Sequence, residues 1–313
     1  MLVIYCSCSL EKKLPAMPKP KIIVCIPGRY GSTRFPAKVL AKDTGKFLIQ
    51  HVYEQAKLAK LPNRVIIAAD DKRIADAAKT FGAECIMTNP DCSSGTDRIA
   101  EAIKKLADSG QRIADRKDKK LNAIRYTLNA DDVVVNLQGD EPEIDPANID
   151  TVAKLLLENL NCEMATLVAD FETKEQVADP NIVKVVVASS VERIADSSEL
   201  KTQNSKLKTN CGIAIYFSRS VIPYDRQQGG IGEIKNYLRH IGIYAYRRNF
   251  LLKITKLPQT PLEKLEKLEQ LRAIENGFDI LVAKVKHTCA GIDTPEQYAE
   301  FVKRYKDSHK ENR

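Results

Sequence analysis

Short, continuous apolar runs alternate with amphipathic stretches through the first half of the chain. The runs are hydrophobic at consecutive positions, whereas the stretches between them repeat apolar residues at helical spacing. Strands that are apolar on both faces are typical of a parallel sheet with helices on both sides. The chain is therefore predicted to have an α/β fold with a mostly parallel sheet and helices on both faces. The four runs are KIIVCIP, RVIIAAD, ECIMT and DVVVNLQGDEP.

Polar residues follow each of these runs. In an open α/β sheet, ligands bind outside the carboxyl ends of the strands, so these residues are expected to face one crevice. They comprise residues 27–38, Asp70, residues 93–98 and residues 138–142.

The second half of the chain has a different pattern. The runs NIVKVVV, CGIAIYFSR and HIGIYAYRR alternate apolar and polar residues, as half-exposed antiparallel strands do. The segment TPLEKLEKLEQLRAIENG is predicted to be one helix, with a Thr-Pro start and Gly277 as its stop, and EQYAEFVKRYK is predicted to be the last helix.

We expect residues 21–303 to form a single domain. Residues 1–20 are expected to be a disordered extension, with Met17 as an alternative start, and residues 304–313 a charged tail. Polar insertions are expected near residues 108–120 and 188–210.

The composition excludes several classes of function. Hydrophobic residues make up 43% and charged residues 29%, and no apolar run is long enough to span a membrane. The net charge of +8 favours anionic partners, but the chain has no dense basic block with interleaved aromatic residues, so nucleic acid is not expected as a partner. The eight cysteines form no C-x-x-C motif, which predicts reduced thiols in a cytoplasmic protein.

The loop IPGRYGSTRFPAKVL, residues 26–40, combines glycines with positive charge from Arg29, Arg34 and Lys38. Glycines let a backbone approach a ligand closely, and these cations suit phosphate groups. The loop matches neither G-x-x-x-x-G-K-[ST] nor G-x-G-x-x-G. From its spacing alone, a phosphate site and a basic surface turn are equally compatible with it.

Two acids favour the phosphate site. Asp140 follows a buried strand in LQGDEP, where a carboxylate can anchor Mg²⁺, and Asp293 in GIDTP is its natural partner. Alternatively, Asp140 belongs to a solvated turn and Asp293 caps the helix that begins at Pro295. Asp293 can do both.

Nine segments together resemble, in order, the 3-deoxy-manno-octulosonate cytidylyltransferases, also called CMP-Kdo synthetases. The resemblance extends over about residues 21–303, outside the two insertions. The segments are IPGRYGSTRFPAKVL, SGTDR, VNLQGDEP, ATLV, DPNIVKVV, YFSRSVIPYDR, LRHIGIYAYRR, PLEKLEKLEQLR and GIDTPEQ.

The resemblance implies a Rossmann-like fold of the nucleotidyltransferase type, with a smaller antiparallel part for dimerisation and sugar binding. It also implies a homodimer that makes CMP-Kdo and pyrophosphate from CTP and Kdo with Mg²⁺. The anomeric hydroxyl of the sugar attacks the α-phosphate of CTP in line, so catalysis rests on alignment and charge neutralisation.

The resemblance also assigns roles to residues. The implied catalytic residues are Arg29, Lys38, Asp140 and Asp293, of which Asp140 and Asp293 hold Mg²⁺. The implied nucleotide-binding residues are Arg29, Ser32, Arg34, Lys38, Ser94, Gly95, Thr96 and Gln138. The implied sugar-binding residues are Arg219, His240, Tyr244, Glu269 and Gln270.

Some alternatives stay open at this point. His240 can instead be a structural strand residue, and the residues alone do not separate Glu263, Glu266 and Glu269, since only the resemblance selects Glu269. The loop departs from the family pattern at Gly28, Phe35, Ala37 and Val39, which leaves the phosphate-binding residues in place. Activation of 8-amino-Kdo or a sialic acid is an alternative function, and a non-catalytic nucleotide- or nucleic-acid-binding module is a more distant one.

Overall fold

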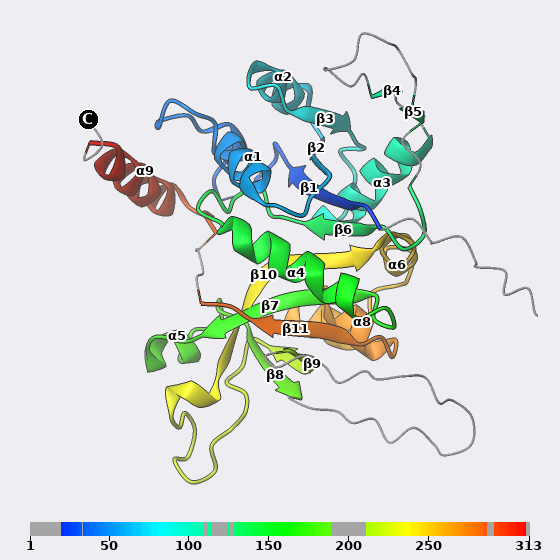
Figure 1. Ribbon diagram of the computed structural model, residues 1–313. Coiled ribbons are helices and arrows are strands. Elements are labelled where there is room, and N and C mark those ends of the chain that lie inside the picture. The colour runs from blue at the N-terminus through cyan, green and yellow to red at the C-terminus, as the bar shows by residue number, and fades with distance from the viewer. Residues whose placement is uncertain are drawn as a thin grey trace, which may run out of the picture.

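Nine strands form one continuous sheet in the order β3-β2-β1-β6-β10-β7-β11-β9-β8 (Figure 1). The structure is a computed structural model that describes residues 20–32, 34–108, 112–113, 124–125, 128–188, 211–286 and 291–310. The strands are β1 Ile22–Gly28, β2 Arg64–Ala69, β3 Glu84–Met87, β6 Val133–Asn136, β7 Met164–Asp170, β8 Lys184–Ala188, β9 Cys211–Ser218, β10 Leu238–Arg247 and β11 Ile280–Lys284. Two short strands, β4 Arg112–Ile113 and β5 Ile124–Arg125, pair separately.

The sheet is mixed, with a parallel part formed by the first half of the chain and antiparallel pairings in the second half, the two patterns that the sequence predicts. β3, β2, β1 and β6 are parallel, as are β7 and β11. β10, however, runs antiparallel between β6 and β7, and β9 is antiparallel to both β11 and β8. The expected antiparallel part therefore continues the same sheet instead of forming a separate one.

The central place of β10 explains this difference. Its C-terminal half buries Ile243, Ala245 and Tyr246 against both neighbours, although its sequence alternates as an exposed strand would. Hydrogen bonding to β6 and β7 on its two sides leaves it no free edge. Local alternation reports which face is polar, but it does not report which strands are neighbours.

Helices cover both faces of the sheet, as predicted. α1, α2 and α4 pack on one face through Ile49, Ile74 and Ile149. α3, α6 and α8 pack on the other face in a second core cluster. The helices are α1 Leu48–Leu58, α2 Lys72–Thr80, α3 Gly95–Asp108, α4 Pro146–Glu158, α5 Lys174–Ala178, α6 Arg248–Ile254, α7 Pro261–Glu266, α8 Leu271–Glu275 and α9 Pro295–Lys310, with 3₁₀ turns η1 Lys38–Leu40 and η2 Ile234–Asn236.

The single helix predicted over residues 260–277 is two short helices. α7 ends at Glu266 because Lys267 adopts a left-handed conformation with φ 55°, and α8 begins only at Leu271. Leucine spacing alone suggested one continuous apolar stripe, yet Leu265 is 80% exposed while Leu268 is buried. The break turns the segment so that Leu268 enters the core.

Other expectations are met or lie outside the described residues. α9 continues to Lys310, through part of the expected charged tail. The extension over residues 1–19 and most of both insertions lie outside the described residues. Cys25, Cys85 and Cys92 are free thiols. None of the described helices is long and apolar enough to cross a membrane.

Candidate functional site

The loops after β1, β2, β3 and β6 meet at the carboxyl edge of the parallel strands, as the sequence predicts. The backbone N–H of Tyr30, after β1, donates to Asp70 Oδ1 at 2.9 Å after β2. Gly139, after β6, lies so close to Pro27 that an added Cβ would be 2.7 Å from the Pro27 carbonyl oxygen. A side chain at position 139 would therefore push the two loops apart.

Lys38 joins this edge to the C-terminal part of the chain. Its Nζ donates to Asp140 Oδ2 at 2.6 Å, to Asp293 Oδ1 at 2.9 Å and to the Ile292 carbonyl oxygen at 2.7 Å. Lys38 itself is buried at the start of η1, after Ala37 in a left-handed conformation. Arg34 Nη2 lies 2.9 Å from Asp293 Oδ2. The structure thus brings together four of the predicted residues.

The charges in this cluster stabilise one another. Burial tends to lower the pKa of Lys38, but Asp140 and Asp293 more than offset it and hold that pKa above its ordinary value. Burial tends to raise the pKa of Asp293, but Lys38 and Arg34 hold it below its ordinary value. Lys38 and Asp293 are therefore both charged at neutral pH.

The two carboxylates suit a magnesium ion. Oxygens of Asp140 and Asp293 lie within 3 Å of the same Lys38 nitrogen, so one cation can contact both. In the described part of the chain, no group of three or more acidic, histidine or cysteine side chains gathers to hold a metal. Magnesium commonly takes one or two protein carboxylates and completes its shell with phosphate oxygens and water. The donor set therefore fits a metal that arrives with a nucleotide.

The predicted nucleotide residues lie around this cluster on two elements. Arg29 and Arg34 are exposed on the loop after β1, and Ser32 is half-buried. Ser94, Gly95 and Thr96 form the N-terminal end of α3, where Ser94 Oγ accepts from the Asp97 N–H at 3.1 Å. An ideal Cβ at Gly95 would lie 3.5 Å from the Pro27 side chain and 4.0 Å from Gln138 Oε1. The end of α3 and the loop after β1 are therefore neighbours.

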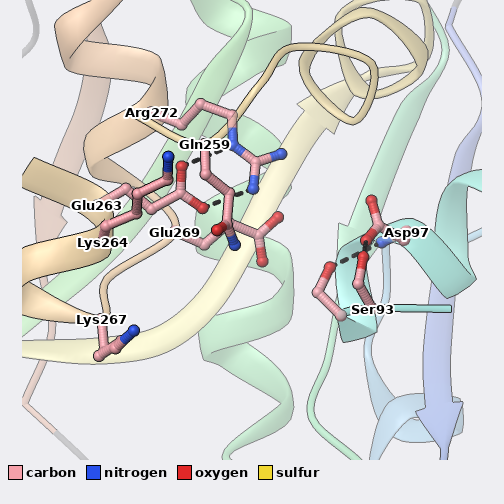
Figure 2. A pocket seen from close by; sticks show the side chains of 9 residues that line it. Ser93, Asp97, Gln259, Glu263, Lys264, Lys267, Glu269 and Arg272 are labelled. Atoms are coloured by element: carbon pink, nitrogen blue, oxygen red, sulfur yellow. Dashed lines mark hydrogen bonds and ion pairs between the residues drawn. The ribbon is translucent and has the colours of Figure 1, made fainter. Parts of the chain in front are cut away.

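A cavity of about 200 Å³ separates α3 from the α7–α8 segment (Figure 2). Ser93 and Asp97 lie on one side of it, and Glu269 lies on the other. Thr96 Oγ1 donates to Glu269 Oε2 at 3.2 Å, and Asn136 Nδ2 lies 3.4 Å from Thr96 Oγ1. The predicted nucleotide and sugar residues thus meet at Thr96 and Glu269.

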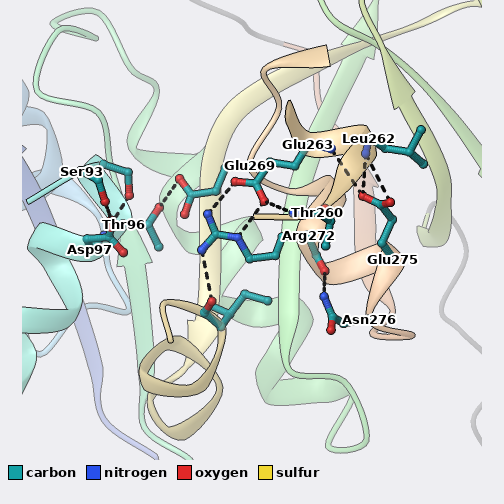
Figure 3. Close-up of polar contacts among 12 residues, drawn as sticks. Ser93, Thr96, Asp97, Thr260, Leu262, Glu263, Glu269, Arg272, Glu275 and Asn276 are labelled. Atoms are coloured by element: carbon teal, nitrogen blue, oxygen red, sulfur yellow. Dashed lines mark hydrogen bonds and ion pairs between the residues drawn. The ribbon is translucent and has the colours of Figure 1, made fainter. Parts of the chain in front are cut away.

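The structure separates the three glutamates that the sequence left equivalent, and Figure 3 shows two of them, Glu263 and Glu269. Glu263 is buried and forms a two-bond ion pair with Arg272, at 2.9 Å and 2.5 Å. Glu266 accepts from Ser218 Oγ at 2.6 Å and from the Arg219 N–H at 3.0 Å. Glu269 lines the cavity, where burial raises its pKa. Glu263 also lines this cavity, but Arg272 neutralises it, so Glu269 is the lining glutamate without a paired cation among the described residues.

His240 and Tyr244 lie together on β10, beside a bulge that falls between Ile241 and Tyr244. The His240 ring is 5.4 Å from that of Tyr244, and its Nε2 lies 2.9 Å from Thr166 Oγ1. Burial lowers the pKa of His240 to about 3 and raises that of Tyr244 well above its ordinary value. Both side chains are therefore neutral hydrogen-bonding groups at neutral pH.

Backbone carbonyl groups hold the Arg219 side chain, and Gln270 is buried. Arg219 Nε donates to the Glu266 carbonyl oxygen at 2.8 Å, and its Nη1 donates to the Pro180 carbonyl oxygen at 3.0 Å. Gln270 is buried directly before α8. Gln270 thus adjoins Glu269 in the chain, whereas Arg219 contacts the α7–α8 segment at Glu266.

Glu141 is a site residue that the sequence reasoning missed. It follows Asp140 and is buried, and its Oε2 has no hydrogen-bond partner among the described residues. Burial and the neighbouring Asp140 raise its pKa to about 8. Its Oε1 would lie 3.4 Å from a Cβ added at Gly242, in the β10 bulge. The second acid of LQGDEP was the available signal, but its burial was not visible in the sequence.

Known proteins resemble this chain over most of its length. The cytidylyltransferase family matches residues 23–280. A 3-deoxy-manno-octulosonate cytidylyltransferase of Solibacter usitatus is 40% identical, covering 93% of this chain and 97% of its own. An 8-amino-3,8-dideoxy-manno-octulosonate cytidylyltransferase of Shewanella frigidimarina is 41% identical, covering 88% and 95%.

A solved structure agrees with the sequence relatives. The structure of CMP:2-keto-3-deoxy-manno-octonic acid synthetase complexed with CTP superimposes with a TM-score of 0.72. It is 35% identical and covers 92% of this chain and 99% of its own. The matches confirm the α/β architecture of a nucleotidyltransferase. The chain therefore belongs to the cytidylyltransferase family, with the 3-deoxy-manno-octulosonate cytidylyltransferases.

Proposed function

We propose that the protein forms CMP-Kdo and pyrophosphate from CTP and 3-deoxy-manno-octulosonate. The observation that carries the proposal is the cluster of Lys38, Asp140 and Asp293, together with the cavity between α3 and the α7–α8 segment that Glu269 lines. The first part suits a metal-bound triphosphate, and the second suits a polyhydroxylated substrate. Relatives about 40% identical over most of their length carry this activity in their names.

In this reaction the chain aligns two substrates and neutralises charge. Arg29, Ser32 and Arg34 would grip the triphosphate, and the Lys38 ammonium would stabilise negative charge as pyrophosphate leaves. A magnesium ion held by Asp140 and Asp293 would polarise the α-phosphate and lower the pKa of the attacking hydroxyl. The end of α3, with Ser94, Gly95 and Thr96, would border the cytidine, together with Gln138 after β6.

The sugar acid would lie on the Glu269 side of the site. His240 and Tyr244 would offer neutral donors and acceptors from β10, and Gln270 and Arg219 would contribute from the α7–α8 side. The contact between Thr96 and Glu269 sits where the two substrates would approach each other. This placement favours direct in-line attack over a covalent enzyme intermediate.

Pyrophosphate release tests the proposal. The purified protein with CTP, Mg²⁺ and Kdo should release pyrophosphate, and Asp140→Ala should lower kcat by at least about 100-fold while staying folded. Asp131→Ala is the matched control. Asp131 is an exposed acid that precedes β6, whereas Asp140 follows it. Full activity of Asp140→Ala would refute the metal assignment.

A panel of sugar acids decides the second substrate. Relatives named for 8-amino-3,8-dideoxy-manno-octulosonate are 40–41% identical, so that sugar is the second candidate. Kdo, 8-amino-Kdo and a sialic acid should be compared by kcat/KM in the same assay. A kcat/KM for 8-amino-Kdo at least tenfold above that for Kdo would reassign the substrate.

We further propose that the protein is a cytoplasmic homodimer. The use of CTP as a substrate supports a cytoplasmic location. Exposed apolar side chains support a dimer. Ile215 on β9 is 55% exposed and Leu265 on α7 is 80% exposed. Light scattering of the purified protein should give twice the chain mass, and Ile215→Asp should shift it toward the monomer.

A further inference from the structure

Asp70 connects two parts of the nucleotide site that come from different elements. Its Oδ1 accepts from the Tyr30 N–H at 2.9 Å, in the loop after β1. Its Oδ2 lies 3.3 Å from Arg98 Nη2, on the first turn of α3. One carboxylate after β2 therefore links the loop proposed to hold the triphosphate with the helix end proposed to hold the base.

Arg98 is a costly residue to bury at this position. Its side chain is 0% exposed, and Asp70 is 11% exposed. Arg98 Nη1 donates to Thr88 Oγ1 at 2.7 Å and to the Asn89 carbonyl oxygen at 3.2 Å. Nε and Nη2 have no hydrogen-bond partner in the part of the chain that the structure describes, so Asp70 meets Nη2 as an ion pair alone. A buried guanidinium balanced by one carboxylate seldom adds net stability over a hydrophobic pair. Its presence here calls for a role other than stability.

Three contacts hold Tyr30 in place in the loop after β1. Its N–H is held by Asp70, and its carbonyl oxygen accepts from the Ala37 N–H at 3.1 Å. The Arg73 guanidinium lies over its ring, 3.4 Å from the centroid. Arg29 on one side and Arg34 on the other are exposed. Moving Tyr30 would therefore move the cations on both sides of it.

We propose that Arg98 and Asp70 are positioning residues, which hold the loop after β1 at a fixed distance from α3 and thereby set the affinity for the triphosphate of CTP. Neither residue needs to touch the substrate, since Asp70 acts through the Tyr30 backbone and Arg98 acts through Asp70. This inference rests on the proposed function of the loop as the phosphate-binding segment. Its distinctive consequence is that losing either residue weakens binding of a triphosphate more than binding of a monophosphate.

Calorimetric titration of CTP and CMP tests the proposal. Asp70→Asn preserves shape but gives Arg98 no counter-charge, and Arg98→Met removes the buried charge. Each is expected to weaken CTP binding by about tenfold and CMP binding by less than about threefold. Arg98→Lys keeps a positive charge and should fall between wild type and Arg98→Met.

The double variant and a second ion pair supply the controls. In Asp70→Asn combined with Arg98→Met, no unpaired charge is left buried, so the loss of CTP affinity should be smaller than the sum of the single losses. Arg64 and Glu84 form a comparable pair across β2 and β3, with Nη2 and Oε1 2.5 Å apart. Glu84→Gln should lower the melting temperature without changing the ratio of CTP to CMP affinity.

The outcomes distinguish a wrong function for the loop from a wrong positioning role for Asp70 and Arg98. If the wild type fails to bind CTP, the proposed function of the loop is wrong. If the wild type binds CTP and the folded Asp70→Asn and Arg98→Lys variants keep its ratio of CTP to CMP affinity, the positioning role is wrong. An equal loss for CTP and CMP would also overturn it, since that result describes general damage to the site.

Discussion

Lys38 donates its Nζ hydrogen to Asp140 Oδ2 at 2.6 Å, although 102 positions separate the two residues. The same ammonium also reaches Asp293 at 2.9 Å. The lysine therefore occupies the place between the two carboxylates that a divalent cation would share. Binding of a metal and a nucleotide must rearrange these contacts, and the first prediction follows from that competition.

Lys38→Met is expected to separate metal binding from catalysis. Without the ammonium, Asp140 and Asp293 repel each other, so the variant should bind Mg²⁺ more tightly than wild type in the absence of CTP. It should nevertheless lose about 100-fold or more in kcat, because no fixed cation stabilises the developing charge. Titration calorimetry with Mg²⁺ and the pyrophosphate assay measure the two effects. Unchanged Mg²⁺ affinity would contradict the competition.

Glu269→Gln is expected to weaken binding of the sugar acid, whereas Glu266→Gln is expected to lower the stability of the fold. Glu269 lines the cavity, whereas Glu266 accepts from Ser218 and from the Arg219 backbone. Glu269→Gln should raise KM for Kdo by about tenfold and leave the melting temperature within about 2 °C of wild type. Glu266→Gln should show the reverse pattern. The two variants change the same chemical group three residues apart, so each controls for the other.

Arg272→Met is expected to unfold the α7–α8 segment more easily. It leaves the buried Glu263 carboxylate without the guanidinium that it now contacts at 2.5 Å and 2.9 Å. Breaking one side of a buried ion pair costs about 3–5 kcal/mol of unfolding free energy. Urea denaturation should show that loss. Combining Arg272→Met with Glu263→Leu should recover much of it, and no recovery would argue against the pair as the cause.

His240 is expected to make the protein less stable as the pH falls below neutral. Its pKa is lowered from 6.5 to about 3 in the folded state, so between these values the unfolded chain binds a proton that the folded chain does not. The contribution of neutral His240 to the free energy of unfolding is fully present above pH 6.5 and is lost progressively as the pH falls toward 3. Near pH 5 the loss reaches about 2 kcal/mol.

His240→Gln provides the comparison for this pH dependence. Glutamine can keep a hydrogen bond to Thr166 but does not titrate. Its urea-unfolding free energy should therefore change less than that of wild type between pH 7.5 and pH 5. Parallel curves for the two proteins would rule out His240 as a source of the dependence.

Much of the site was predictable because its parts lie directly after strands. The apolar runs ending near Gly28, Asp70 and Gln138 located the carboxyl edge of the sheet, and the motifs selected Lys38 and Asp140 on it. The burial of Glu141 was not predictable, since two adjacent acids are equally compatible with a solvated turn. Its burial depends on the β10 bulge at Gly242, more than 100 positions away.

The sequence by itself determined the local elements and the chemistry at their ends, because apolar periodicity reports which face of each segment is buried and motifs preserve residue types at fixed spacing. Tertiary structure alone decided how the elements combine. It placed β10 antiparallel between β6 and β7, broke the helix after Glu266, and gave Glu263, Glu266 and Glu269 three different partners. Chemically identical side chains are distinguished only by what packs against them, and those neighbours come from distant parts of the chain.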